Sequence, residues 1–120
     1  MHDTLQPGIT NEATHTVTAA MSAPHLPRVV LATPTMIGLI EGACLLATKP
    51  HLDDDETTVG THVCVSHQAA AIEGEEITIR CRLTEVNRRR LTFAVTVDTA
   101  GSRISEGTHE RAVVSLSRMG

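Results

Sequence analysis

A single carboxylate interrupts the longest apolar stretch of the chain. Glu41 is the only charged residue between Thr35 and Thr48, and no Lys or Arg lies within one helical turn of it. Because burial of an isolated charge costs several kcal/mol, this side chain must be solvated, paired or retained for a task. The alternatives are a carboxylate on a narrow solvent-exposed stripe and a catalytic nucleophile or general base.

A second candidate is the imidazole of His67, near the end of a segment with a β pattern. Strand parity directs His67 to the core together with Val63 and Val65, so it is either a core histidine bonded to a carbonyl or a catalytic acid or base. A metal site is disfavoured, because His62 and Cys64 point to the opposite face from His67. The remaining histidines stand in polar or terminal surroundings and are expected at the surface: His2, His15, His25, His51 and His109.

Three further residues have types that suit substrate binding. Thr33 precedes a proline and a predicted helix start, where its hydroxyl can meet exposed amides in a capping or turn role, and spacing alone does not exclude that role. Gly60 is either a turn glycine or a position where a backbone amide approaches a ligand closely. Arg111 is either a solvated strand arginine or the partner of an anionic ligand. The sequence has no Gly-rich phosphate loop and no Gly-x-Ser-x-Gly nucleophile elbow.

One helix and several strands must position these residues. The segment from Thr35 to Thr48 is apolar nearly all round and is followed by Lys49-Pro50, which predicts a buried helix that ends there. Between residues 22 and 34, Pro24 and Pro27 resist regular structure. Alternating apolar and polar residues predict five strands, at Glu12–Ala20, Val59–Ala69, Glu76–Val86, Leu91–Val97 and Ile104–Leu116.

One strand, an apolar helix and four further strands predict an α+β fold, in which a mainly antiparallel sheet wraps around one long hydrophobic helix. This is the hot-dog architecture. The length of 120 residues fits a single domain, residues 1–120, in which we expect residues 1–11 to be flexible. One sheet of this size cannot cover a helix that is apolar on every face, so we expect a homodimer, with a higher oligomer as the alternative.

Composition argues against several classes of partner. The net charge is -4 and Phe93 is the only aromatic residue, so nucleic acid is not expected to bind. The longest apolar run, Met36 to Ala47, is shorter than the roughly 20 residues that cross a bilayer, and the N-terminus lacks the pattern of a secretion signal. We therefore expect a cytoplasmic protein without membrane contact. Its widely spaced cysteines, Cys44, Cys64 and Cys81, are expected to be reduced core thiols.

Several motifs, in their order and separation, resemble one family. From about Glu12 to Leu116 the sequence resembles the fluoroacetyl-CoA thioesterase family of hot-dog proteins. The residues that carry the resemblance are Thr33, Met36–Cys44, Gly60–His67 and Gly107–Val113. The resemblance implies that the chain is an acyl-CoA thioesterase and that its catalytic residues are Thr33, Glu41 and His67.

The resemblance also implies a role for each residue. Glu41 is expected to be the nucleophile or the base that activates water, His67 the general acid/base, and Thr33 its hydrogen-bonding partner. The backbone amide of Gly60 is expected to polarise the thioester carbonyl, with Arg111 near the pocket. No metal or cofactor is implied, since coenzyme A is part of the substrate.

The connection from Met21 to Leu31 departs from the family pattern. It looks shorter than the family's lid region and contains no phenylalanine. We therefore expect hydrolysis of a short or medium acyl thioester without strong selectivity for fluoroacetyl-CoA. The alternatives are a hot-dog hydratase or dehydratase, which also uses a carboxylate and a histidine, and a non-catalytic module that binds acyl-CoA or another small molecule.

Overall fold

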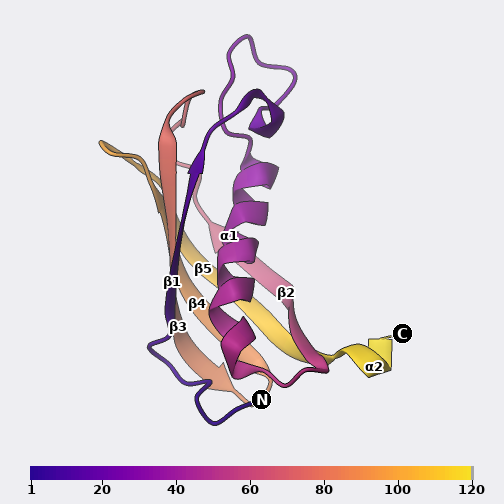
Figure 1. Ribbon diagram of the computed structural model, residues 1–120. Helices are drawn as coiled ribbons and strands as arrows, with labels where there is room; N and C mark the ends of the chain where they lie inside the picture. Colours follow the sequence, from indigo (N-terminus) through magenta and orange to yellow (C-terminus); the bar gives the residue numbers. More distant parts are fainter. Residues whose placement is uncertain (120) are drawn as a thin grey trace.

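A five-stranded antiparallel sheet with one long helix along one of its faces makes up most of the molecule (Figure 1). The computed structural model describes residues 1–119. The sheet order is β1-β3-β4-β5-β2, so β1 and β2 are its edges. The elements are β1 (Thr10–Thr16), α1 (Thr33–Thr48), β2 (Glu56–Val65), β3 (Glu76–Asn87), β4 (Arg90–Asp98), β5 (Arg103–Ser115) and a short α2 (Leu116–Met119). The predicted α+β class and the sheet around one helix are confirmed.

Helix α1 ends at Thr48, as the Lys49-Pro50 pair predicted, but it begins at Thr33, two residues earlier than expected. Pro34 fits the first turn because the amide hydrogen that it lacks has no partner within the helix there. The N-cap is Ala32, and no side chain caps the helix. Thr33 therefore belongs to the first turn, and its hydroxyl is free for another contact.

The strands match the alternating pattern best in the second half of the chain. β3, β4 and β5 each start and end within one residue of the predicted bounds. β1 covers residues 10–16, four residues short of the predicted end, because the chain turns into a 3-10 helix at Ala19–Met21. β2 begins at Glu56 and ends at Val65, so the predicted strand over residues 66–69 is wrong.

The core lies between the sheet and α1. The face of β3 that carries Ile77, Ile79 and Leu83 is buried, as its period of two predicted. Phe93, the only aromatic side chain, is fully buried on β4. The helix contributes its own buried face, formed by Met36, Ile40, Ala43, Cys44 and Ala47.

Apolar side chains on α1 and on β2 stay uncovered in the single chain. On α1, Leu46 is 57% exposed, as expected for a helix that is apolar on every face and is covered by one sheet only. On the edge strand β2, Val63 is 37% exposed and Cys64 is exposed, against the expectation that both lie in the core. A register shift between Gly60 and His62 breaks the simple parity on which the prediction for Val63 rested.

Residues 1–9 pack against the loop that follows α1. Leu5 is buried, the backbone amide of His2 donates to the carbonyl of His51, and the terminal amine lies 2.8 Å from Asp53. The flexibility expected for residues 1–11 in solution stays a prediction. Within residues 1–119, no helix has the length and apolar character needed to cross a membrane.

Candidate active site

Glu41 forms an ion pair with a residue of the sheet. Its Oε2 atom lies 3.3 Å from Nη1 of Arg111, a residue of β5 that is 70 positions away in the chain. The Glu41 side chain is 41% exposed, whereas that of Arg111 is 5% exposed. The carboxylate is therefore both partly solvated and paired, and the arginine is not the solvated strand residue that was one of the alternatives.

Arg111 is held by more than its ion pair. Its Nε donates to Oγ1 of Thr58 at 2.8 Å, and its Nη2 donates to the Thr58 carbonyl at 2.9 Å. Its Nη1 also lies 3.1 Å from Nε2 of His109. Because contacts on three sides fix the plane of the guanidinium, the position of the charge that faces Glu41 is fixed too.

Gly60 on β2 leaves the space that the Glu41 carboxylate occupies. A Cβ atom at this position would collide with Oε2 of Glu41 and would lie 3.2 Å from Cε1 of His109. The register shift that follows leaves Thr61 without a partner on β5. Backbone groups at such a bulge are released from the strand ladder, so an amide donor can be available beside the carboxylate.

The expected surface position of His109 is wrong, because its side chain is fully buried. Its Nδ1 lies 2.8 Å from the carbonyl of His62. Burial lowers the pKa of this imidazole, and the nearby charge of Arg111 acts in the same direction. Strand parity could have identified it, since His109 shares the buried face of β5 with Arg111 and Val113.

We call Glu41, Thr58, Gly60, His109 and Arg111 the carboxylate cluster.

A second group, the imidazole pair, consists of Thr33 and His67. The Thr33 Oγ1 atom lies 2.7 Å from Nδ1 of His67. His67 follows the end of β2, and the neighbouring backbone keeps it beside β5: Ser66 N donates to the Glu106 carbonyl and Gln68 N to that of Ile104. The structure thus brings together two of the three residues assigned to catalysis, and the hydroxyl of the first helical turn contacts an imidazole.

The imidazole pair borders a cavity of about 500 Å³. Much of its wall comes from the connection between the 3-10 helix (Ala19–Met21) and α1, and the ends of this connection pair through Ser22 and Leu31. His25 is exposed as expected, but it also lies in this wall. The lining residues are Ala23, His25, Leu26, Val30, Leu31, Ala32, Thr33, His67, Gln68, Ala69 and Ala70.

The carboxylate cluster and the imidazole pair are separate within one chain. Glu41 lies eight residues after Thr33 on the same helix, which corresponds to about 12 Å along its axis. In the part of the chain that the structure describes, Glu41 contacts Arg111, and His67 contacts Thr33, but no hydrogen bond joins the two groups. The carboxylate cluster contains a carboxylate in a fixed position, and the imidazole pair contains a group that can donate and accept protons.

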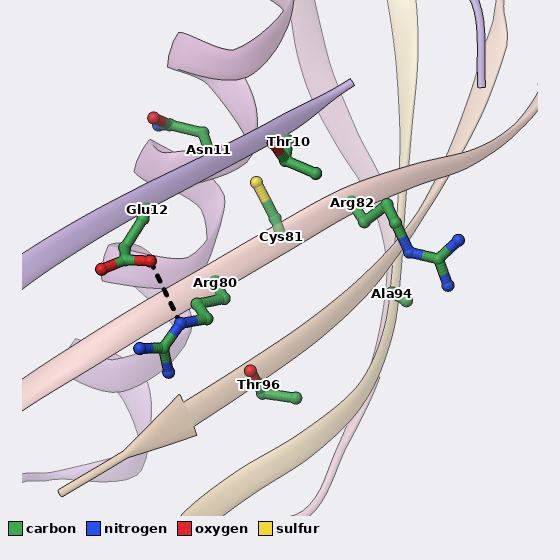
Figure 2. A pocket seen from close by; sticks show the side chains of 8 residues that line it. All are labelled: Thr10, Asn11, Glu12, Arg80, Cys81, Arg82, Ala94 and Thr96. Atoms are coloured by element: carbon green, nitrogen blue, oxygen red, sulfur yellow. Dashed lines mark hydrogen bonds and ion pairs between the residues drawn. The ribbon is translucent and has the colours of Figure 1, made fainter. Parts of the chain in front are cut away.

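A larger cavity, of about 770 Å³, lies elsewhere, over β1, β3 and β4 (Figure 2). Figure 2 shows Asn11 on the side of the helix, whereas Arg80 and Arg82 extend away from it. Arg80 is paired with Glu12 at 3.1 Å. The residues that line this cavity include no histidine, and the thiol of Cys81 is buried against the helix side of the strand. The predicted site residues lie at the smaller cavity and in the Glu41 region instead.

The antiparallel sheet around one helix defines a hot-dog fold. The model of the family described as fluoroacetyl-CoA-specific thioesterase (FlK) matches residues 10–117. The chain belongs to this family. A fluoroacetyl-CoA thioesterase of Streptantibioticus cattleyicolor is 42% identical over 89 residues, which are 74% of this chain. The match spans 64% of that relative, less than two thirds of its length.

Solved structures agree with the family assignment. The structure of the fluoroacetyl-CoA thioesterase FlK superimposes with a TM-score of 0.91 at 33% identity, covering 98% of this chain and 93% of that one. A phenylalanine-to-alanine variant of the same enzyme, in complex with fluoroacetate and CoA, gives 0.90 at 33% identity and covers 97% of this chain and all of that one. A thioesterase superfamily member from Thermus thermophilus, at 20% identity, shares the fold with a TM-score of 0.89, covering 98% of this chain and 89% of its own.

Proposed function

We propose that the chain hydrolyses short or medium acyl-CoA thioesters, using the carboxylate cluster and the imidazole pair. One observation carries the proposal: in a member of a thioesterase family, a half-exposed carboxylate, Glu41, is fixed by buried Arg111 beside the glycine edge of β2. Thioester hydrolysis needs a nucleophile or base, a proton donor for the leaving thiolate and donors for the developing oxyanion. The two groups contain candidates for all three.

In the proposed reaction Glu41 either activates a water molecule that attacks the thioester carbonyl or attacks the carbonyl itself. Attack by Glu41 forms a mixed anhydride when the thiolate leaves, and water then hydrolyses this anhydride and regenerates the carboxylate. A backbone amide at Gly60 and the following bulge stabilises the oxyanion. The carbon–sulfur bond then breaks, and His67 delivers a proton to the leaving thiolate of coenzyme A. Thr33 orients the imidazole through its 2.7 Å hydrogen bond. The products are a carboxylic acid and free coenzyme A, and the reaction uses no metal or further cofactor.

The proposed enzyme is a homodimer with its active site at or near the subunit interface. Support comes from the uncovered surfaces: Leu46 on α1 and Val63 on the edge strand β2 are exposed apolar side chains, and α1 packs on β2. A second copy would cover both surfaces and could place further groups beside Glu41, which lies about 12 Å from Thr33 along α1. Sedimentation should show a dimer at micromolar concentration, and a monomer alone would contradict the assembly.

We propose that the enzyme has no strong preference for fluoroacetyl-CoA. The relative that acts on fluoroacetyl-CoA carries a phenylalanine that was replaced in one of its solved structures. Here the connection from Met21 to Leu31 has no phenylalanine, and Phe93 is fully buried in the sheet core. Selectivity for a small polar group calls for a closed, water-free pocket, which this wall lacks the aromatic side chains to form.

The selectivity proposal is tested by kcat/KM for fluoroacetyl-CoA and for acetyl-CoA. We expect the two values to lie within about tenfold of each other, which is 1.4 kcal/mol or less. A ratio of about a thousandfold, or 4 kcal/mol, would show that the chain builds a selective pocket by other means.

We also propose a cytoplasmic location. Cys64 is an exposed free thiol, and Cys44 and Cys81 are free as well, which suits a reducing compartment. Fractionation of the source cells that recovered the protein outside the cytoplasm would contradict this.

One experiment separates hydrolysis from the alternative functions. Purified protein is mixed with a panel of saturated and enoyl acyl-CoAs of two to ten carbons. Release of free thiol indicates hydrolysis, loss of enoyl absorbance without thiol indicates a hydratase, and calorimetric binding without turnover indicates a binding module. We expect thiol release, and we expect it to be lost in the Glu41→Gln variant.

A further inference from the structure

The buried imidazole of His109 contacts two groups of fixed hydrogen-bonding character. Its Nδ1 lies 2.8 Å from the carbonyl oxygen of His62, which can only accept a hydrogen bond. Its Nε2 lies 3.1 Å from Nη1 of Arg111, which can only donate one. Both bonds form together only if Nδ1 carries the proton and Nε2 is unprotonated. The surroundings therefore select one neutral tautomer of His109.

The same two bonds join two parts of the proposed site. Through Nε2, His109 accepts a hydrogen bond from the guanidinium that contacts Glu41. Through Nδ1, it ties β5 to the β2 backbone at the bulge that follows Gly60. The side chain is fully buried, so water does not replace either bond.

We propose that His109 is a positioning residue for acyl-CoA hydrolysis, and this inference rests on the proposed hydrolase function. As a neutral acceptor it holds Arg111 at the orientation in which Nη1 faces the Glu41 carboxylate. It does not touch the substrate. Its link to the β2 bulge is secondary to this role.

Without the acceptor, the guanidinium keeps its two bonds to Thr58 but loses the contact that fixes its other end. Arg111 Nη1 is the atom shared by His109 and Glu41, so a change at one contact moves the other. The charge opposite Glu41 would then sample several positions, and a misplaced carboxylate lowers the rate of the chemical step more than substrate affinity.

Two conservative variants separate the two bonds of His109. The amide of Asn places its nitrogen near the position of Nδ1, so His109→Asn can keep the bond to the His62 carbonyl but cannot reach Arg111. The amide oxygen of Gln lies near the position of Nε2, so His109→Gln can still accept from Arg111 but loses the bond to His62. The positioning role thus predicts that Gln preserves activity better than Asn.

The kinetic test compares kcat and KM for acyl-CoA hydrolysis in both variants. We expect His109→Gln to stay within about fivefold of the native kcat and His109→Asn to lose about tenfold or more, with KM nearly unchanged, as for loss of a hydrogen bond to a charged group. The matched controls, His15→Gln and His15→Asn on the far edge strand β1, should leave both constants unchanged. Equal losses, or a larger loss for Gln, would overturn the positioning role in favour of a structural link to the bulge.

A second arm reads the tautomer directly and does not depend on turnover. Nitrogen-15 NMR of the native protein should show His109 with a protonated Nδ1 and a free Nε2. This state should persist below pH 6.5, the ordinary pKa of a histidine. The charged and titratable groups around it are Arg111 and Glu110 on β5, Glu41 on α1 and His62 on β2. A protonated Nε2, or protonation of His109 at or above pH 6.5, would overturn the inference.

The two arms keep the inference apart from the proposed function. If the native protein released no thiol from any acyl-CoA, the hydrolase function would fail, and the NMR arm would still decide whether His109 holds Arg111 as described. If the native protein hydrolysed acyl-CoA but Asn outperformed Gln, the inference alone would fail.

Discussion

The carboxylate cluster and the imidazole pair are built in opposite ways. The cluster is part of the sheet: its arginine and histidine are buried on β5, and every polar atom of the Arg111 guanidinium has a partner. The pair depends on one hydrogen bond between an exposed threonine and a histidine that follows the end of a strand. A group whose charge must stay in one place is preorganised by buried contacts, whereas a group that moves protons can sit beside the cavity with few contacts.

The largest expected effect comes from changing the carboxylate and nothing else in the cluster. Glu41→Gln keeps the shape of the side chain and can still accept the hydrogen bond from Arg111. We expect kcat to fall by about 10²- to 10⁴-fold, the range typical of a lost catalytic acid or base, with little change in melting temperature. Steady-state kinetics and thermal unfolding check both parts. A variant that retained most of its activity would remove Glu41 from the mechanism.

The next effect tests whether the cluster is structural as well as catalytic. Arg111→Met leaves the Thr58 carbonyl and Nε2 of His109 buried without their donor. We expect the free energy of unfolding to fall by about 2–5 kcal/mol, measured by chemical denaturation. Arg118→Met, at an exposed position of α2, is the control and should change stability by less than about 0.5 kcal/mol. Similar values for both variants would show that the buried contacts of Arg111 contribute little.

Substitutions in the imidazole pair should lower the catalytic rate rather than the stability of the fold. His67→Gln is expected to lower kcat by about a hundredfold, as for a lost general acid. Thr33→Val removes one hydrogen bond and should cost about three- to tenfold. Neither change should lower the melting temperature by more than a few degrees. If Thr33→Val were the more damaging of the two, the threonine would have a role beyond orienting His67.

The smallest effect is a pH dependence of stability that comes from the cluster alone. Burial and then Arg111 lower the pKa of His109 below its ordinary value of 6.5. Below that pH the unfolded chain binds a proton that the folded chain does not, so stability falls as pH drops from 6.5 toward the folded pKa, and is unaffected above it. Between pH 7 and pH 5, His109→Gln should therefore lose less stability than the native protein. An equal loss in denaturant titrations at the two pH values would contradict this.

The sequence was informative where one strand or one helix decides the outcome. The end of α1 and the buried face of β3 followed from Lys49-Pro50 and from a period of two. The position of Val63 was mispredicted because a bulge, which depends on pairing with β5, changes the parity of β2. The long apolar helix correctly suggested a core element, but one chain covers only part of it.

In the candidate site, too, residue types could be read from the sequence, whereas contacts between distant residues could not. Glu41 and Arg111 were each identified by type, but their pairing joins residues 70 positions apart and depends on the fold. The predicted surface position of His109 rests on its polar neighbours, whereas strand parity places the side chain on the buried face of β5. The grouping of Thr33, Glu41 and His67 in one active site rests on the resemblance to the family and stays a prediction, because within one chain only Thr33 and His67 are in contact.

A double-variant cycle between Glu41 and His67 tests most directly whether the two separate groups serve one reaction. kcat/KM is measured for acetyl-CoA hydrolysis with the native enzyme, with each single variant to Gln and with the double variant. Residues that act as a unit are strongly non-additive, so we expect the double variant to lie within about threefold of Glu41→Gln alone. Losses that multiply to the product of the two single effects would show that the carboxylate cluster and the imidazole pair act independently, and would contradict the proposed mechanism.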